Sequence, residues 1–371
     1  MRRKIVSGIM LSLLLIGMVI LTFDIQSVRA SGTIYIRADG SVEGTTHITS
    51  VDNMTYTLTG NITSDTDGIV LRKDNIVING AGYALQGPFG FSKSDPITIG
   101  IHLSEKSNVT IKNIKIHGFK YGVFLSSSSN NIISQSNITD SYHGIHFTKS
   151  SNNTISENRI TNANSGIRLV SSNYNRIYGN KVTNNVEGIK IEDACSNNYV
   201  VENNVANNWN GVQLIQSSTN TISENNITTN KGRGLWLWSS FGNQIYHNNI
   251  INNTIQADIL QADIQVPNYT NSWDNGGEGN YWSDYVGIDD NSDGIGDTPY
   301  VIDENNIDNY PLMEPLILNK DAIPLWMQWS FWTIVVAGIV VLAVVVYLRK
   351  RKSITPITLP PPTEGIETSI E

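Results

Sequence analysis

Apolar and polar positions along the chain repeat with a period of 22 or 23 residues between positions 100 and 238. In each unit a glycine precedes an apolar, a variable and another apolar residue, as in "GIHF" at 144–147 and "GIRL" at 166–169. These runs are short, alternate with period 2, and show no 3.6-residue helical period. The pattern therefore predicts short strands whose alternate side chains, such as Ile145 and Phe147, point inward.

Two independent anchors share this period. The glycine anchor falls at Gly100, Gly122, Gly144, Gly166, Gly188, Gly211 and Gly234. An asparagine two residues before Ile or Val recurs at Asn131, Asn153, Asn175, Asn198, Asn220 and Asn243. A unit of this length cannot bury its own apolar face, so we expect the units to stack as rungs about 4.8 Å apart, with asparagine amides stacked into a ladder.

Stacked units of this kind predict an all-β fold, a parallel β-helix built of coils of about 22 residues. A leucine-rich-repeat horseshoe is the rival architecture, but the chain lacks the Leu-x-x-Leu-x-Leu signature. Counting the Gly-Ile-x-Leu unit at Gly68 gives eight coils. We expect the repeats to occupy residues 67–262, an N-terminal β cap 31–66 and a C-terminal cap 263–316.

Both ends of the chain carry long apolar runs. Residues 1–30 have a basic start, an uncharged run and the small residues Val28 and Ala30 before a cut at Ser31, which predicts a secretory signal peptide. An uncleaved anchor is the alternative. Residues 329–348 carry no charge over a length sufficient to cross a bilayer as one transmembrane helix.

The basic "RKRK" run at 349–352 follows this second apolar segment. The positive-inside rule then assigns residues 349–371 to a cytoplasmic tail and the repeats to the outside of the cell membrane. Residues 317–328 become a juxtamembrane linker. The chain is thus predicted to be a single-pass surface protein with an extracellular ectodomain.

Composition excludes two classes of protein. The formal net charge is −8, which argues against a nucleic-acid partner. Cys195 is the single cysteine, so an intramolecular disulfide framework is impossible.

Three kinds of segment resemble the NosD-type β-helix family: "DNIVINGAGYALQG" at 74–87, repeat units such as "TNTISENNIT" at 219–228, and "GNYWSDYVGIDDNSDGIGDTPYVIDENNIDNYPLM" at 279–313. The resemblance covers residues 32–313 and implies a right-handed parallel β-helix in the cell envelope. The family name comes from a periplasmic accessory protein linked to copper delivery. Fold relatives include pectin-active lyases and hydrolases, but a shared fold does not fix a function.

The outward positions of the predicted strands form two adjacent stripes. The first runs His102, Phe124, His146, Arg168, Lys190, Gln213 and Trp236, and Trp238 belongs to the second. Aromatic rings suit stacking on sugars, and Arg or Lys suits acidic sugars, so this face predicts binding of a polysaccharide or envelope glycan. The alternative is that Trp236 and Trp238 pack beneath the segment after residue 257.

Acidic and basic residues on the same face raise the possibility of catalysis. Arg168, Lys190 and Glu192 are the candidates for a polysaccharide lyase or hydrolase, because such chemistry needs carboxylates and a basic residue together. Copper would need His, Met or Cys at close spacing. We expect no preformed copper site, since Phe124 separates His102 from His146, and a regular strand puts His143 and His146 on opposite faces.

The stretch "DDNSDGIGD" at 289–297 alternates oxygen-bearing side chains in a spacing typical of calcium loops. Asp289, Asn291, Asp293 and Asp297 are the predicted ligands of a structural Ca²⁺, although position 12 of the loop is Tyr300 rather than Glu. The sequence thus leaves three functions open: a glycan-binding surface protein, a polysaccharide lyase or hydrolase, and a structural, adhesion or NosD-like copper-accessory protein.

Overall fold

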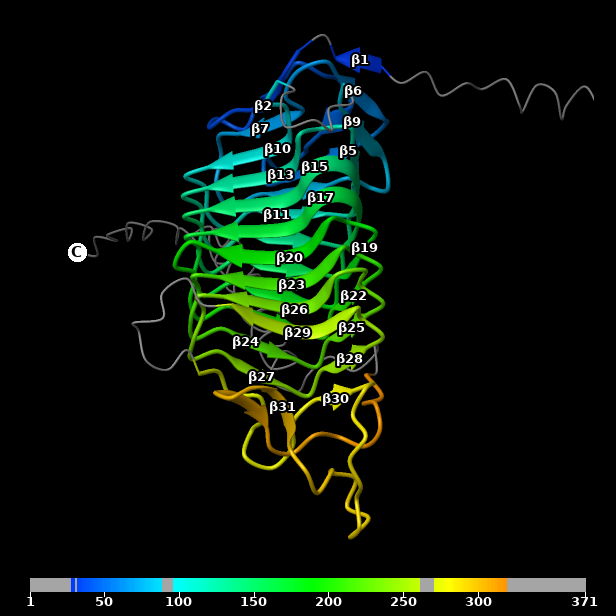
Figure 1. Cartoon of the computed structure of the whole chain (residues 1–371). Coiled ribbons are helices and arrows are strands. Elements are labelled where there is room, and N and C mark those ends of the chain that lie inside the picture. The colour runs from blue at the N-terminus through cyan, green and yellow to red at the C-terminus, as the bar shows by residue number, and fades with distance from the viewer. Residues whose placement is uncertain (1–27, 31, 89–95, 261–269, 319–371) are drawn as a thin grey trace, which may run out of the picture. The chain divides into compact units, whose positions relative to one another are not determined.

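Short parallel strands stack into the β-solenoid that the repeat predicts, with about nine turns around one apolar core (Figure 1). The computed structural model describes residues 28–30, 32–88, 96–260 and 270–318. Within these ranges all regular elements are strands. Each full coil contributes one strand to each of three faces, which we call facets 1, 2 and 3.

Facet 1 carries the glycine anchor and the predicted stripes. Its strands pair in parallel from one coil to the next, and the second halves of β15 and β17 belong to it. They are β2 (Ile34–Ile36), β7 (Ile69–Leu71), β10 (Ile99–Ser104), β13 (Tyr121–Ser126), β15 (Asn137–Thr148), β17 (Arg159–Val170), β20 (Glu187–Glu192), β23 (Asn210–Ile215), β26 (Arg233–Trp238) and β29 (Ile255–Leu260).

Facet 2 precedes facet 1 in each coil and includes the first halves of β15 and β17. Its other strands are β1 (Val28–Ala30), β6 (Ile62–Ser64), β9 (Ala84–Gln86), β12 (Lys115–His117), β19 (Lys181–Thr183), β22 (Asn204–Ala206), β25 (Asn226–Thr228), β28 (Asn249–Ile251) and β30 (Tyr281–Trp282).

Facet 3 is a separate ten-stranded sheet. Its strands are β4 (Ile48–Thr49), β5 (Thr55–Leu58), β8 (Val77–Asn79), β11 (Thr110–Lys112), β14 (Ile132–Ser134), β16 (Thr154–Ser156), β18 (Arg176–Tyr178), β21 (Tyr199–Val201), β24 (Thr221–Ser223) and β27 (Gln244–Tyr246). Residues of the predicted N-terminal cap, 31–66, supply β2, β5 and β6, which stack in parallel on the next coil, and β3 (Val42–Glu43), which pairs antiparallel with β2.

The predicted inward positions form the core. Ile145, Phe147, Ile167 and Leu169 are all fully buried, which confirms the period-2 prediction for these strands. The glycine anchor has a steric cause, because a Cβ atom on Gly144 would lie 2.6 Å from the carbonyl oxygen of Gly166 in the next rung. The backbones approach too closely at this corner for any side chain.

Buried asparagine ladders run along the corners of the solenoid. In the ladder predicted from the second anchor, each Nδ2 donates to the Oδ1 of the asparagine one coil further on, as from Asn175 to Asn198 at 3.1 Å and from Asn198 to Asn220 at 2.9 Å. That Oδ1 also accepts the backbone N–H of the preceding asparagine. The ladder prediction is confirmed, and its amides lie inside the solenoid rather than in solvated turns.

The C-terminal end is closed by side chains from outside the repeat. Trp273 and Trp282 are buried with ring centroids 5.8 Å apart, and Tyr300 stacks on Trp282 at 4.2 Å. The antiparallel hairpin β31 (Tyr300–Asp303) and β32 (Asn306–Asp308) ends two ladders, because Asn306 accepts from Asn271 and Asp308 accepts from Asn280.

Several sequence predictions fall outside the described residues. These are most of the signal peptide (1–27), most of the juxtamembrane linker (319–328), the transmembrane helix at 329–348 and the tail at 349–371. The part of the chain that is described contains no helix of the length and apolarity needed to span a membrane.

Candidate functional site

The first predicted stripe is one continuous row on facet 1, which we call outer row 1. Strand register places its members directly opposite one another in successive rungs. They are His102, Phe124, His146, Arg168, Lys190, Gln213 and Trp236. The adjacent outer row 2 includes Val170, Glu192, Ile215 and Trp238. In-register stacking thus converts a position in the repeat into a line of outward side chains, of which His146 and Gln213 are buried.

A third row lies beside these two at the glycine corner. Tyr121, His143, Ser165, Glu187 and Asn210 stand opposite one another in consecutive rungs, immediately before the glycine, and form the corner row. The glycine is skipped in the strand pairing, and a Cβ atom on Gly144 would point toward Ile160 in the core. The alternation of inward and outward side chains along the strand is therefore interrupted at this glycine.

This interruption corrects the prediction that His143 and His146 lie on opposite faces. Both rings project from facet 1 with centroids 5.0 Å apart. The physical reason is the glycine between them, because Gly144 and Ile145 both turn toward the core and leave the residues on either side facing outward.

The candidate catalytic residues form one ion-pair network. Arg168 Nε donates to Glu192 Oε1 at 2.5 Å, and Lys190 Nζ lies 3.2 Å from both Glu192 Oε2 and Glu187 Oε1. Ser165 Oγ donates to the other oxygen of Glu187 at 2.6 Å. Each carboxylate thus contacts at least one neighbouring cation, an arrangement that orders these side chains.

Electrostatics keep the histidines of this face neutral. Burial lowers the pKa of His143 to about 2, with His146 and Arg168 acting in the same direction. Burial, followed by the charge of Arg168, lowers the pKa of His146 to about 3. Arg168 Nη1 donates to His143 Nε2 at 3.1 Å, because a guanidinium has no acceptor, so the ring proton resides on His143 Nδ1.

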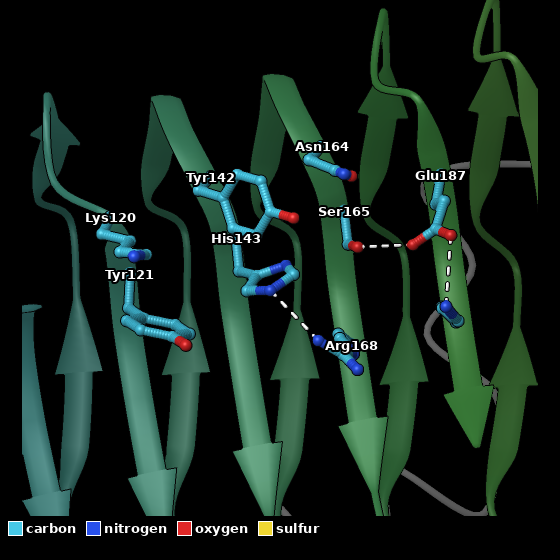
Figure 2. A pocket seen from close by; sticks show the side chains of 9 residues that line it. Lys120, Tyr121, Tyr142, His143, Asn164, Ser165, Arg168 and Glu187 are labelled. Atoms are coloured by element: carbon cyan, nitrogen blue, oxygen red, sulfur yellow. Dashed lines mark hydrogen bonds and ion pairs between the residues drawn. The ribbon is translucent and has the colours of Figure 1, made fainter. Parts of the chain in front are cut away.

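These side chains surround a hollow of about 470 Å³ (Figure 2). Figure 2 shows Lys120 and Tyr121 on one side, Glu187 on the other, and His143 and Arg168 between them. The lining residues are Lys120, Tyr121, Tyr142, His143, Asn164, Ser165, Arg168, Glu187 and Lys190. The hollow is therefore polar, lined by three cationic side chains, and open to solvent along facet 1.

Aromatic side chains lie at one end of the hollow and, two rungs beyond Lys190, further along facet 1. Tyr121 contacts Phe124 and His143 with ring centroids 5.2 and 5.4 Å apart. Further along the solenoid, Arg233 covers the half-buried ring of Trp236 at 4.7 Å, whereas Trp238 is 39% exposed. The segment after residue 257 begins as β29, which continues the stack beside these tryptophans, and residues 261–269 lie outside the described residues.

Sequence reasoning missed the corner row and a rim row two residues before each glycine. The rim row consists of Lys120, Tyr142, Asn164, Val186 and Trp209. Trp209 is 56% exposed, more than either tryptophan of the predicted stripes. The signal was present in the repeat, since reading one and two positions before the glycine anchor aligns these residues at the same period.

The predicted calcium ligands lie in an exposed loop stabilised by its own side chains. Asp289 Oδ2 accepts the backbone N–H of Gly294 at 2.9 Å. Asn291 Oδ1 and Asp293 Oδ1 each accept the backbone N–H of the residue two positions further along the chain. Asp297 accepts the N–H of Asp290 at 2.7 Å. Asp303, a nearby acid further along the chain, accepts a hydrogen bond from Asn306 Nδ2. The loop is thus closed by side-chain-to-backbone hydrogen bonds.

Comparison with known proteins gives a family and a set of distant folds. A family described as "Periplasmic copper-binding protein (NosD)" matches residues 23–208 and 90–287. A probable ABC transporter binding protein NosD of Stutzerimonas stutzeri is 38% identical over 79 residues, which span 20% of this chain and 18% of that protein. Its counterpart in Pseudomonas aeruginosa is 39% identical over 71 residues, spanning 18% of this chain and 16% of that protein.

Among solved structures, the periplasmic alginate epimerase AlgG has a TM-score of 0.45 at 14% identity over 64% of this chain and 74% of that one. The enzymatically active domain of tailspike protein 2 of bacteriophage CBA120 has a TM-score of 0.44 at 12% identity, over 66% of this chain and 42% of that one.

The residues of the described part do not fit a copper centre. No group of three or more His, Cys, Asp or Glu side chains in these ranges is arranged to hold a metal ion. His143 Nε2 is occupied by Arg168, whose positive charge opposes a second cation. Cys195 is buried, and burial raises the pKa of its thiol to about 11, so it stays protonated.

Proposed function

The chain belongs to the NosD family, which is described as periplasmic copper-binding proteins, and from this premise we propose that it works outside the cytoplasm as a module that binds an extended polysaccharide along facet 1. The family description supports the location, and the side chains of facet 1 support the ligand. Because the donors of facet 1 do not suit copper, the proposal rests on stacking and hydrogen bonding rather than on metal binding.

One observation carries the proposal. The seven side chains of outer row 1 are aligned in register across consecutive rungs, and the exposed Trp238 lies beside the end of that row. A line of regularly spaced polar and aromatic groups fits a polymer of repeating rings better than it fits a small compact ligand. Aromatic rings bind the apolar faces of sugars, while Lys and Arg bond to hydroxyl groups.

Cleavage of the polysaccharide, by a lyase or a hydrolase reaction, is the competing activity at the same residues. The contacts of the two carboxylates favour binding, because Glu192 is engaged by both Arg168 and Lys190, and Glu187 is engaged by Lys190 and Ser165. Polymer length, followed alongside retention, distinguishes the two. Retained chains of unchanged length support binding, and shortened chains would replace the proposal with an enzyme.

We expect Trp238→Ala to weaken polysaccharide retention by about fivefold to tenfold while the unfolding temperature changes little, since one stacked ring contributes roughly 1 kcal/mol. Affinity electrophoresis of the purified full chain in gels containing neutral and acidic polysaccharides measures this. Tyr199→Ala is the matched control, because Tyr199 is similarly exposed at 45% but lies on facet 3. Equal losses in both variants contradict the proposed face.

The membrane attachment predicted from residues 329–348 remains part of the proposal. A single C-terminal helix would hold the solenoid at the outer surface of the membrane, where facet 1 meets envelope or environmental glycans.

Calcium in the loop at 289–297 is proposed as a structural ligand of the C-terminal end. We expect 1 mM Ca²⁺ to raise the unfolding temperature of the EDTA-treated chain by several degrees, because a ligand at 100 times its Kd stabilises the folded state by about 2.7 kcal/mol. Asp293→Asn should abolish the shift, and Asp65→Asn, an exposed acid far from the loop in sequence, should not. Scanning calorimetry measures both, and an unchanged unfolding temperature contradicts the site.

A further inference from the structure

Eight asparagines of the chain stand in the tripeptide Asn-x-Thr, in which the middle residue is not proline. In proteins outside the cytoplasm this tripeptide is the acceptor for N-linked glycans, which need an exposed asparagine side chain. Asn268 lies outside the described residues. The other seven fall into two structural groups, and they are Asn53, Asn61, Asn108, Asn137, Asn152, Asn226 and Asn252.

The first group, which we call the corner asparagines, lies between strands and is exposed. Its members all have a left-handed backbone with φ between 52 and 58°, and they are Asn53, Asn108, Asn152 and Asn252. Asparagine adopts this conformation more readily than most other residues, so a tight corner of the solenoid favours it. Asn108 Nδ2 donates one hydrogen bond, to Asn75 Oδ1 at 3.0 Å, and keeps a second hydrogen that a glycan can replace.

The second group, which we call the facet 2 asparagines, lies at the start of strands. Asn137 and Asn226 are the first residues of β15 and β25, Asn61 immediately precedes β6, and all three are half-buried. Asn226 Oδ1 accepts a hydrogen bond from Asn249 Nδ2 at 2.7 Å, and Asn61 Oδ1 accepts the backbone N–H of Ala84 at 2.9 Å. A glycan on these residues would have to fit between side chains of rungs about 4.8 Å apart.

We propose that the corner asparagines carry N-linked glycans and that the facet 2 asparagines do not. In the transfer, asparagine Nδ2 forms a bond to the anomeric carbon of an oligosaccharide carried on a lipid phosphate. The bond from that carbon to the phosphate oxygen breaks, the lipid phosphate leaves with the bonding electrons, and Nδ2 loses one proton. The cell supplies both this lipid-linked donor and the transferase. The assignment rests on the location outside the cytoplasm proposed above and is independent of polysaccharide binding.

Glycans on the corner asparagines would leave the proposed binding face open. Asn108 lies between β10 and β11, and Asn152 between β15 and β16, which places both at the corner where facet 1 ends and facet 3 begins. None of the corner asparagines lines the hollow. A bulky hydrophilic chain at these corners would make the surface of the solenoid more soluble.

Trypsin separates the two groups within one molecule. Cleavage after lysine and arginine releases residues 107–112 and 150–159, which contain Asn108 and Asn152, and residues 121–149 and 191–231, which contain Asn137 and Asn226. Each of these peptides holds a single Asn-x-Thr tripeptide, so mass spectrometry measures each site separately. With the full-length chain purified from the cells that naturally produce it, we expect the first two peptides to gain the mass of a glycan and the last two to keep their unmodified mass.

Asn152→Gln and Asn137→Gln are the matched variants, expressed in the same cells. On a denaturing gel Asn152→Gln should migrate faster by the mass of one glycan, whereas Asn137→Gln should migrate as the wild-type chain does. Unmodified peptides at both Asn108 and Asn152, or equal modification of the facet 2 asparagines, overturns the assignment. Neither result alters the retention of polysaccharide by facet 1, so the proposed function would still stand.

Discussion

Replacing Asp308 with alanine is expected to reduce the free energy of unfolding of the C-terminal coils by on the order of 3 kcal/mol. Asp308 is fully buried and accepts hydrogen bonds from the backbone N–H of Asn280 at 2.7 Å and from Trp282 Nε1 at 2.8 Å. Alanine leaves these donors without an acceptor in the core. Urea unfolding combined with hydrogen exchange of residues 270–318 measures the loss, because the damage should be confined to the end of a repeat array.

Asp308→Asn is the matched control, since it keeps an acceptor oxygen and removes the buried charge. Burial raises the pKa of Asp308 from 3.8 to about 6, against the opposing effect of Trp282 and the Asn280 N–H. The folded chain thus binds this proton more tightly than the unfolded chain, and this residue's contribution to stability falls as pH rises from about 4 to 6. The stability of the Asp308→Asn variant should not show this decrease between about pH 4 and 6. Alanine, asparagine and wild-type chains of equal stability would contradict the ladder-end role.

Asn198→Ala is expected to reduce the free energy of unfolding by roughly 3 to 5 kcal/mol, at least as much as Asp308→Ala, because Asn198 lies in the middle of a buried ladder. Its Oδ1 accepts both the N–H and the Nδ2 of Asn175, and its Nδ2 donates to Asn220 Oδ1 and to a backbone carbonyl of an earlier coil. Alanine removes all four interactions and leaves their partners unsatisfied. Chemical unfolding followed by circular dichroism measures the change.

Asn204→Ala provides the comparison for Asn198. Asn204 lies on β22 with its half-buried side chain on the outside of facet 2, so we expect a loss of less than about 0.5 kcal/mol. A similar cost at both positions would show that the ladder amides add nothing beyond ordinary strand residues.

The polar interior connects stability to the candidate site. From the coil of Asn131 onward, buried amides at the corners link successive rungs, and the outward side chains of facet 1 repeat at a fixed interval. A binding face for a polymer needs this regularity more than it needs any single contact. Substitutions in the ladder should therefore weaken glycan binding through loss of register, whereas Trp238→Ala acts on contact alone.

Much of the fold follows from the sequence because parallel, in-register stacking maps the period of the sequence directly onto position in space. The glycine and asparagine anchors located the coils, the inward pairs such as Ile145 and Phe147, the ladder asparagines, and the alignment of outer row 1. Local pattern sufficed here, since each residue's neighbours are its own equivalents one period away.

The tertiary structure decided what the period alone does not contain. The break in alternation at the glycine corner brings His143 beside His146 and creates the corner row, so a regular-strand reading put His143 on the wrong face. The links from Arg168 to Glu192 and His143 depend on side-chain reach between rungs and rows. Asn306 and Asp308 end their ladders from a non-repeating hairpin, and such long-range closure has no period to reveal it, because the partners are fixed by packing rather than by spacing along the chain.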